Sequence, residues 1–123
     1  MSAPLVLVID DDYRLRELYR LNLEMRGLAV AEASNGDDGI KFARNGTPAV
    51  IVLDLAMPGT DGWAVLDALK TDPALSAIPV VVLTGHTDEQ VEEDARKAGA
   101  VAFVAKPVDT DDLVRVVMQH ANV

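Results

Sequence analysis

Six polar residues with carboxylate, hydroxyl or ammonium side chains directly follow short apolar runs of the chain. They are Asp10, Asp11, Asp12, Asp54, Thr84 and Lys106. If the apolar runs are parallel strands of one open sheet, the residues that follow them meet at a single edge of that sheet. Carboxylates within about 5 Å of one another repel by a few kcal/mol per pair at an effective dielectric of roughly 20. Such a cluster needs a bound cation or a raised pKa.

The ligand atoms in this expected cluster are all oxygens, which favours a hard divalent cation. Mg²⁺ fits best, because it binds through one or two carboxylates, a backbone carbonyl and several waters, and Mn²⁺ is its nearest substitute. The D-x-D-x-D-G pattern of a helix–loop–helix calcium site is absent from the sequence. The residue types therefore predict a magnesium site.

One of the carboxylates is placed to act as a nucleophile. Asp54 stands alone after the third apolar run, whereas Asp10 and Asp11 are paired and suit the holding of an ion. A metal ion and the Lys106 ammonium would neutralise charge on the equatorial oxygens of a phosphoryl group, and the Thr84 hydroxyl would donate a hydrogen bond to it. This combination predicts phosphoryl transfer to Asp54.

Each of these residues also has an ordinary structural explanation when it is taken singly. Asp11 or Asp12 can cap the first helix, since aspartates after strands are common helix caps and turn residues. Thr84 alone is typical of a turn, and Lys106 alone is typical of a solvated surface. The combination of all of them at one sheet edge favours a chemical role.

Five apolar segments of strand length must position these residues. They span 5–9, 28–33, 49–53, 78–83 and 101–105. Their Val and Ile content favours strands over buried helices. Four of the five are apolar nearly throughout, which suits strands of a parallel sheet that is covered on both faces.

Between these segments, apolar residues recur at spacings of three and four, which predicts helices. In the first such stretch they are Leu15, Leu18, Tyr19 and Leu23. Gly27 and Gly99 follow the first and fourth stretches, where a left-handed C-cap residue is expected. Thr87 with Gln90 predicts a capping box at the start of the fourth helix. The fivefold alternation predicts an α/β domain with a parallel sheet and helices on both faces.

Composition excludes several classes of protein. A chain of 123 residues that is half hydrophobic has enough apolar surface for one core and little room for a second. The net charge of −9 and the lack of a Lys/Arg cluster argue against nucleic acid as a partner. No apolar run is long enough to cross a bilayer, and residues 1–4 do not resemble a signal peptide. Without cysteines as well, the sequence predicts a cytoplasmic protein.

Four short motifs occur in a fixed order along the chain. They are VIDDD at 8–12, VLDLAMPGTDG at 52–62, VLTG at 82–85 and FVAKP at 103–107. With these motifs the sequence resembles the receiver domain of bacterial two-component response regulators, the chemotaxis regulators included, over nearly its whole length. The resemblance implies one receiver domain over 1–123, with a doubly wound (βα)₅ fold, a five-stranded parallel sheet of order 2-1-3-4-5 and flavodoxin-like architecture.

The resemblance also implies roles for the polar residues. Asp54 would accept a phosphoryl group from a histidine kinase or a phosphotransfer protein. Asp10, Asp11 and Asp54 would hold Mg²⁺ together with the backbone carbonyl of Ala56, with Asp11 bound directly and Asp10 largely through a water. Lys106 would pair with Asp54 and then with the phosphoryl oxygens.

Other positions match the family's switching and tuning residues. Thr84 would move inward to hydrogen-bond the phosphoryl group, and Phe103 stands where the family places a switching aromatic, although ordinary core packing explains it equally well. Ala56 and His86 occupy positions that tune how fast water reaches the acyl phosphate, so replacing His86 is expected to change the phosphoryl lifetime. The peptide bond at 106–107 is often cis in receivers, and the sequence leaves it open.

Phosphorylation is expected to change the surface formed by the fourth helix, the fifth strand and the fifth helix. Receivers meet downstream partners or dimerise there, so the expected partner is another protein, a fused output domain or a second copy of the chain. Charges of both signs, such as Glu93, Lys97 and Arg115, suit salt-bridged self-pairing or an ordinary solvated face. Like other receivers, the chain would catalyse only its own phosphorylation and dephosphorylation.

Three other kinds of protein could share parts of this pattern with a phosphorylated receiver. A small Mg²⁺-dependent phosphatase with an Asp nucleophile typically needs a second Asp two residues later, where this chain has Ala56. A flavin-binding module would need a first loop that accepts phosphate, and the carboxylates at 10–12 would repel it. A receiver that signals without phosphorylation is the most serious rival. The complete set of site residues argues against it, namely Asp10, Asp11, Asp54, Thr84 and Lys106.

Overall fold

The computed structural model of the 123-residue chain describes residues 3–85 and 88–121. Its strands are β1 (Leu5–Ile9), β2 (Ala29–Ala33), β3 (Val50–Asp54), β4 (Val80–Thr84) and β5 (Ala102–Ala105). Its helices are α1 (Tyr13–Glu24), α2 (Gly36–Gly46), α3 (Gly62–Thr71), α4 (Glu89–Lys97) and α5 (Thr110–His120). Strands and helices alternate along the chain, as the sequence predicts.

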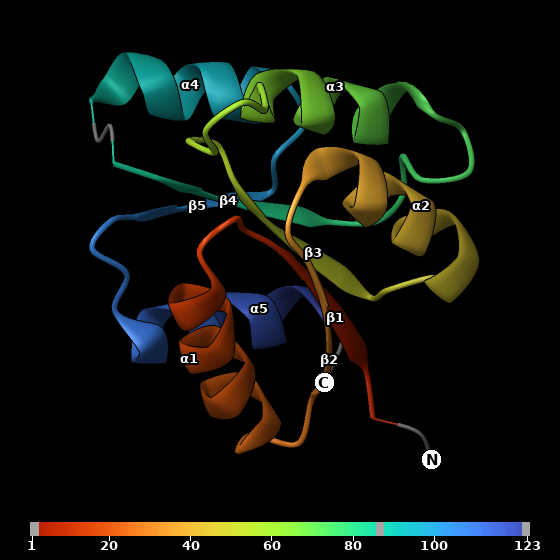
Figure 1. Cartoon of the computed structure of the whole chain (residues 1–123). Helices are drawn as coiled ribbons and strands as arrows, with labels where there is room; N and C mark the ends of the chain where they lie inside the picture. The colour runs from red at the N-terminus through yellow and green to blue at the C-terminus, as the bar shows by residue number, and fades with distance from the viewer. Residues whose placement is uncertain (1–2, 86–87, 122–123) are drawn as a thin grey trace.

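The strands form one parallel sheet in the order β2-β1-β3-β4-β5. Helices α2, α3 and α4 cover one face of this sheet, and α1 and α5 cover the other (Figure 1). The predicted fold class and strand order are therefore confirmed. In this arrangement the carboxyl ends of all the strands point to the same side of the molecule, the left-hand side in Figure 1.

The uninterrupted apolar character of the central strands follows from burial on both faces. In β1, Leu7 and Ile9 contribute to the core beneath α2 and α3, whereas Val6 and Val8 contribute to the core beneath α1 and α5. Successive side chains of a strand point to opposite faces, so both sets must be apolar when helices cover both faces.

An aspartate or asparagine caps the start of each helix. The capping residues are Asp12, Asn35, Asp61, Asp88 and Asp109. The predicted capping box at Thr87 is wrong, because the N-cap of α4 is Asp88, whose carboxylate accepts from the Val91 N–H at 2.8 Å. Thr87 itself lies outside the described residues. The predicted C-terminal glycines are confirmed, with φ of +87° at Gly27 and +106° at Gly99.

Two details differ from the sequence-based expectation. The fourth strand begins at Val80 rather than at 78, because Pro79 has no N–H to donate to a neighbouring strand. Leu18, which the spacing placed on the buried side of the first helix, is 43% exposed, while Tyr19 and Leu23 are buried. One residue rotates a helix by about 100°, which is enough to take Leu18 off the face centred on Tyr19.

No helix in the described part of the chain has the length and apolar character needed to span a membrane.

Candidate functional site

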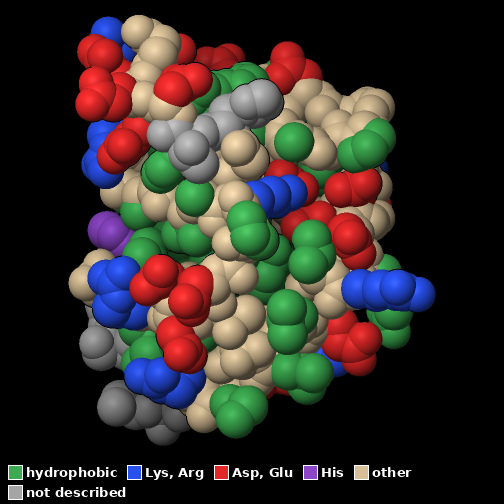
Figure 2. Space-filling view, turned by 90° about the vertical axis from the view of Figure 1, so that its left-hand side faces the viewer, with side chains coloured by type: hydrophobic (Ala, Val, Ile, Leu, Met, Phe, Trp, Pro, Cys, Tyr) green, Lys and Arg blue, Asp and Glu red, His purple; other side chains and the backbone are tan. Residues whose placement is uncertain are grey.

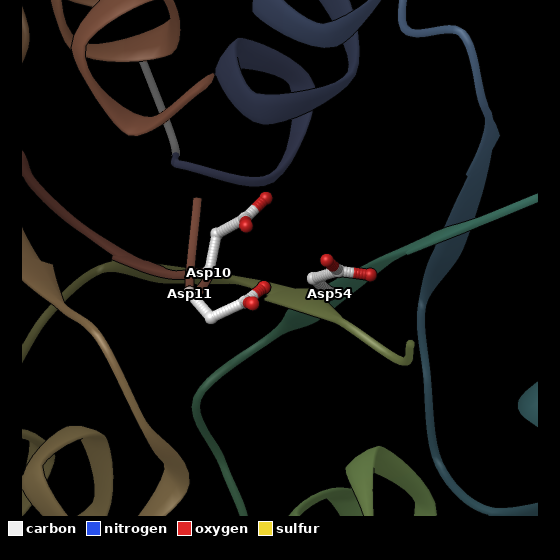
Figure 3. Close-up of side chains that lie close together, drawn as sticks. All are labelled: Asp10, Asp11 and Asp54. Carbon is white, nitrogen blue, oxygen red and sulfur yellow. The ribbon is translucent and has the colours of Figure 1, made fainter. Parts of the chain in front are cut away.

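Three carboxylates meet at the carboxyl edge of the sheet. Ile9 and Leu53 are paired in register on β1 and β3, so Asp10 and Asp54, the residues that follow them, emerge side by side. Asp11 continues the β1–α1 loop. One carboxylate oxygen from each of the three lies within 4.8 Å of the others, and Figure 3 shows the side chains gathered at the ends of β1 and β3.

Asp10 is the most deeply buried member of the cluster, with no exposed surface. Its Oδ1 accepts a hydrogen bond from the Asp12 N–H at 2.8 Å, whereas its Oδ2 is buried without a hydrogen-bond partner among the described residues. Burial, followed by the charges of Asp54 and Asp11, raises the pKa of Asp10 to about 6, against the lowering effects of the Asp12 N–H and Lys106. An unpartnered buried oxygen beside two further carboxylates fits a small, hard cation such as Mg²⁺.

Asp54 is held at both of its carboxylate oxygens. Its Oδ1 accepts from the Ala56 N–H at 2.9 Å, and its Oδ2 lies 2.8 Å from the Lys106 Nζ. The Asp54 side chain is 2% exposed, and that of Lys106 is 25% exposed. The Asp54 carboxylate is therefore fixed in orientation between the Ala56 N–H and the Lys106 ammonium.

The neighbouring strands bring Thr84 and Lys106 to the same edge. Thr84 is the last residue of β4, the strand next to the one that carries Asp54, and it is buried. The Lys106 N–H donates to the Thr84 carbonyl at 2.8 Å, which ties the end of β5 to the end of β4. The peptide bond between Lys106 and Pro107 is cis.

The remaining predicted site residues are less closely joined to this cluster. Asp12 serves as the N-cap of α1 and accepts from the N–H groups of Arg14 and Leu15, which confirms the structural alternative for that residue. Ala56 is exposed beside Asp54, and Phe103 is half-buried in β5 and packs against the core beneath α2, α3 and α4. His86 lies outside the described residues.

Two residues of α1 near the cluster, Arg16 and Tyr19, were not predicted to belong to the site. Arg16 donates from Nη1 to the backbone carbonyl of Asp10 at 2.7 Å. The pKa of the buried Tyr19 is raised to about 12 by its burial and by the charges of Asp10, Asp54 and Asp12, which places its hydroxyl within electrostatic reach of the carboxylates. No pattern in the sequence signals the Arg16 contact, because its acceptor is a backbone carbonyl.

The loop after β3 depends on a close backbone approach at Gly62. A Cβ placed at Gly62 would lie 2.5 Å from the Cα and carbonyl oxygen of Leu55. We expect Gly62→Ala to destabilise the protein by about 2 kcal/mol, because backbone atoms must move to make room. Gly85→Ala is the matched control, since a Cβ there meets nothing within 4 Å, and its effect should stay within about 0.5 kcal/mol. Urea denaturation that finds the two variants equally stable would contradict this role of Gly62.

The face that carries the cluster is the one shown in Figure 2. It is the left-hand side of Figure 1, toward which the carboxyl ends of the strands point. Near the centre of this view a basic side chain (blue) lies against a group of acidic ones (red), with hydrophobic side chains (green) beside and below them. This face therefore carries acidic, basic and apolar side chains close together, and of the cluster itself Asp11 is exposed whereas Asp10 and Asp54 are buried.

Comparisons with known proteins agree on one family. A sequence model described as "Response regulator receiver domain" matches residues 6–118. The protein PilH of Pseudomonas aeruginosa is 35% identical over 114 residues, which cover 91% of this chain and 93% of PilH. The transcriptional regulatory protein AfsQ1 of Streptomyces coelicolor is 34% identical over 122 residues, which cover 97% of this chain and 53% of AfsQ1.

Solved structures show the same likeness. The structure of the Francisella response regulator 1452 receiver domain superposes with a TM-score of 0.91 at 26% sequence identity and covers 97% of each chain. A cluster of acidic residues of the kind formed by Asp10, Asp11 and Asp54 is typical of the Mg²⁺ site of receivers. Receivers are typically not enzymes that turn over a separate substrate. Because the family match spans most of the sequence and the fold agrees with it, this chain belongs to the response regulator receiver domain family of two-component signalling.

Proposed function

We propose that residues 1–123 act as one receiver domain that takes a phosphoryl group onto Asp54 from a phosphohistidine donor in the presence of Mg²⁺. The observation that supports this most directly is the setting of Asp54. Its buried carboxylate lies 2.8 Å from the Lys106 ammonium and shares a cluster with Asp10 and Asp11. A fixed nucleophile beside a cation and two potential metal ligands has the parts that phosphoryl transfer needs.

Asp10, Asp11 and Asp54 would hold the ion, with the backbone carbonyl of Ala56 as a further ligand. Bound Mg²⁺, or Mn²⁺ in its place, neutralises negative charge on the carboxylates and on the incoming phosphoryl oxygens. The buried, unpartnered Oδ2 of Asp10 and its raised pKa support this assignment, because a cation would relieve both the desolvation and the repulsion.

The transfer step follows from the groups around Asp54. A carboxylate oxygen of Asp54 forms a bond to phosphorus, the phosphorus–nitrogen bond of the donor breaks, and its electron pair remains on the imidazole. Lys106 stabilises the charge on the phosphoryl oxygens, and the Thr84 hydroxyl donates to one of them. The N–H of Ala56 donates to the Oδ1 of Asp54 at 2.9 Å and so helps to hold the carboxylate in one orientation. Water later attacks the phosphorus of the acyl phosphate, the bond between phosphorus and the Asp54 oxygen breaks, and inorganic phosphate leaves as the carboxylate is restored. The small side chain of Ala56 leaves room for this water.

A protein donor must cover the rim of this site, and α1 offers the apolar surface for it. The described chain has five exposed large hydrophobic side chains, and four of them, Tyr13, Leu18, Leu21 and Met25, belong to α1 and its C-cap. Tyr13 begins the helix immediately after the acidic loop and is 64% exposed. We infer that a histidine kinase or phosphotransfer protein docks on this surface, since exposed apolar side chains next to the acidic loop are the kind of surface that protein interfaces cover.

Replacing Leu18 with Glu separates docking from chemistry. We expect the variant to receive phosphate from a phosphohistidine protein at least about tenfold more slowly, because a charge replaces an apolar contact at the interface. Its phosphorylation by a small acyl phosphate should be unchanged, since that donor needs no docking surface. Stopped-flow or rapid-quench phosphotransfer measures both rates. Equal slowing with both donors would show that Leu18 acts on the site itself.

We propose that Thr84 and Phe103 relay the phosphorylated state to the surface of α4, β5 and α5, where a downstream protein, a fused output domain or a second copy would bind. The basic side chains of this surface already have acidic partners on their own helices. Lys97 lies 3.0 Å from Glu93, and Arg115 lies 3.4 Å from Asp112. A homodimer held by salt bridges would have to replace these contacts. Such a receiver is expected in the cytoplasm and to act without contacting nucleic acid or a membrane directly.

Chemical trapping tests the assignment of the phosphoacceptor. After incubation with Mg²⁺ and a small acyl phosphate, borohydride reduction converts an aspartyl phosphate to homoserine, and peptide mass mapping locates it. The proposal expects homoserine at position 54 alone and none in Asp54→Asn. Homoserine at Asp10 or Asp11 in the wild type would contradict it.

A further inference from the structure

The side chain of Arg16 joins the backbone of Asp10 to Glu32 on the edge strand of the sheet. Its Nη1 donates to the backbone carbonyl of Asp10 at 2.7 Å, and its Nε donates to the Oε1 of Glu32 at 3.1 Å. The Arg16 side chain is 14% exposed and reaches from α1 across to β2, where Glu32 pairs in register with Val8. The guanidinium thus spans two segments that are far apart in sequence.

The backbone of Asp10 is fixed on both sides by these contacts. Its N–H donates to the carbonyl of Ala33 at 3.1 Å, and its carbonyl accepts from Arg16. With the two peptide groups that flank Asp10 held in this way, the Asp10 carboxylate stays in its buried position although one of its oxygens has no partner among the described residues. The peptide group between Asp10 and Asp11, whose carbonyl accepts from Arg16, sets the direction of the chain into Asp11.

Glu32 is itself held by a second arginine. The Nε of Arg20 lies 3.3 Å from the Oε2 of Glu32, and the Nη1 of Arg20 lies 2.9 Å from Glu24. The two oxygens of Glu32 are therefore divided between Arg16 and Arg20, which limits the positions that Glu32 can take. The Arg16 guanidinium is therefore held by Glu32 and cannot move freely with the β1–α1 loop.

We propose that Arg16, locked by Glu32, is a positioning residue that raises the affinity of the carboxylate cluster for its metal ion. This inference rests on the proposed Mg²⁺ site. Arg16 contacts a backbone carbonyl and no carboxylate of the cluster, so it acts through the placement of Asp10 and Asp11. Groups that orient metal ligands from outside typically change metal affinity by 10- to 100-fold when they are removed.

Charge repulsion alone predicts the opposite change in metal affinity when Arg16 is removed. The sign of the change therefore distinguishes a positioning role from a purely electrostatic one. Arg16 carries a positive charge near the place where a divalent cation would bind, and like charges repel. If the charge were its only effect, Arg16→Met would tighten metal binding. If Arg16 acts by positioning, the same variant weakens binding although a repelling charge has been removed.

The test is a metal titration of the full chain. Free Mn²⁺ is followed by electron paramagnetic resonance, and Mg²⁺ by competition against it, so that the readout is binding and not phosphorylation. We expect Arg16→Met to raise the Kd about tenfold. Arg16→Lys keeps the charge but lacks the planar fork that reaches both the Asp10 carbonyl and Glu32, so a smaller loss in the same direction is expected.

Arg44→Met is the matched control. Arg44 also pairs with a carboxylate through its Nε and Nη2, at 3.2 and 3.1 Å from Asp72, but it does not contact the acidic loop. The Kd of the Arg44→Met variant for the metal ion should equal that of the wild type. A second readout is the rate of phosphorylation by a small acyl phosphate, which in the Arg16 variants should recover toward the wild-type rate at saturating metal.

An unchanged or lower Kd in Arg16→Met overturns the proposal. If that variant does not fold, Arg16→Lys and Glu32→Gln decide, and unchanged affinity in both overturns it. A wild-type protein that binds neither Mn²⁺ nor Mg²⁺ contradicts the proposed function itself and not the role of Arg16 alone.

Discussion

Replacing Asp10 with Asn is expected to stabilise the metal-free protein by about 3 kcal/mol at pH 7.5 and to abolish tight Mg²⁺ binding. At that pH the buried carboxylate is ionised although its pKa in the folded protein is raised to about 6 from an ordinary value of 3.8. Each unit of such a difference corresponds to about 1.4 kcal/mol. Asn has nearly the same shape and no charge, so it removes this cost together with the metal ligand.

The pH dependence of the Asp10 effect has a definite sign. Between pH 4 and pH 6 the folded state holds a proton on Asp10 that the unfolded state has released, so this group makes stability fall as pH rises through that window. In urea denaturation, the free energy of unfolding of Asp10→Asn should therefore exceed that of the wild type by a large amount at pH 7.5 and by little at pH 4. Saturating Mg²⁺ should stabilise the wild type and not the variant. An advantage that is the same at both pH values would contradict this account of Asp10.

The second large effect is expected at Lys106. In Lys106→Met the Asp54 carboxylate, which is 2% exposed, loses the ammonium that lies 2.8 Å from it. Removing one partner of a buried ion pair leaves an uncompensated charge, and because Lys106 is a quarter exposed we expect a loss of about 3 kcal/mol, at the low end of the range for such pairs. Phosphorylation by a small acyl phosphate should also slow by about 10²-fold, since one group that stabilises the transferring charge is gone.

A double variant isolates the charge effect of Lys106. If the loss arises from the stranded carboxylate, Lys106→Met combined with Asp54→Asn should regain most of the stability, and the free energies of the two single changes should not add. Urea denaturation of the wild type, the two single variants and the double variant, all without metal, gives the coupling free energy between Lys106 and Asp54. Additive free energies would show that Lys106 stabilises the fold by its packing instead.

The sequence was sufficient to predict most of the fold because burial on both faces of the sheet leaves a clear pattern. Runs such as the one in β1 are apolar throughout, which marks them as strands. The residues that directly follow parallel strands must lie at the carboxyl edge of the sheet. Pattern alone was less reliable on α1, where the spacing that includes Leu18 fits a buried stripe but the sheet lies under Tyr19 and Leu23. Which side of an amphipathic helix is buried depends on its packing partner.

Other features of the site depend on three-dimensional contacts that residue types do not encode. The raised pKa of Asp10 comes first from burial, which has no signature at position 10 itself. The acceptor of Arg16 is a backbone carbonyl, and every residue has one. At the start of α4, Thr87 and Asp88 are both good capping residues, so local preference could not choose between them.

We expect Asp54 to accept a phosphoryl group in a reaction that depends on a bound divalent metal ion. Intact-mass spectrometry of the protein, taken quickly after incubation with Mg²⁺ and a small acyl phosphate, tests it most directly. The expected result is a gain in mass of one phosphoryl group in the wild type, and this gain should disappear in Asp54→Asn and when a chelator removes the metal. A gain that persists in Asp54→Asn, or that is unchanged by the chelator, would contradict it.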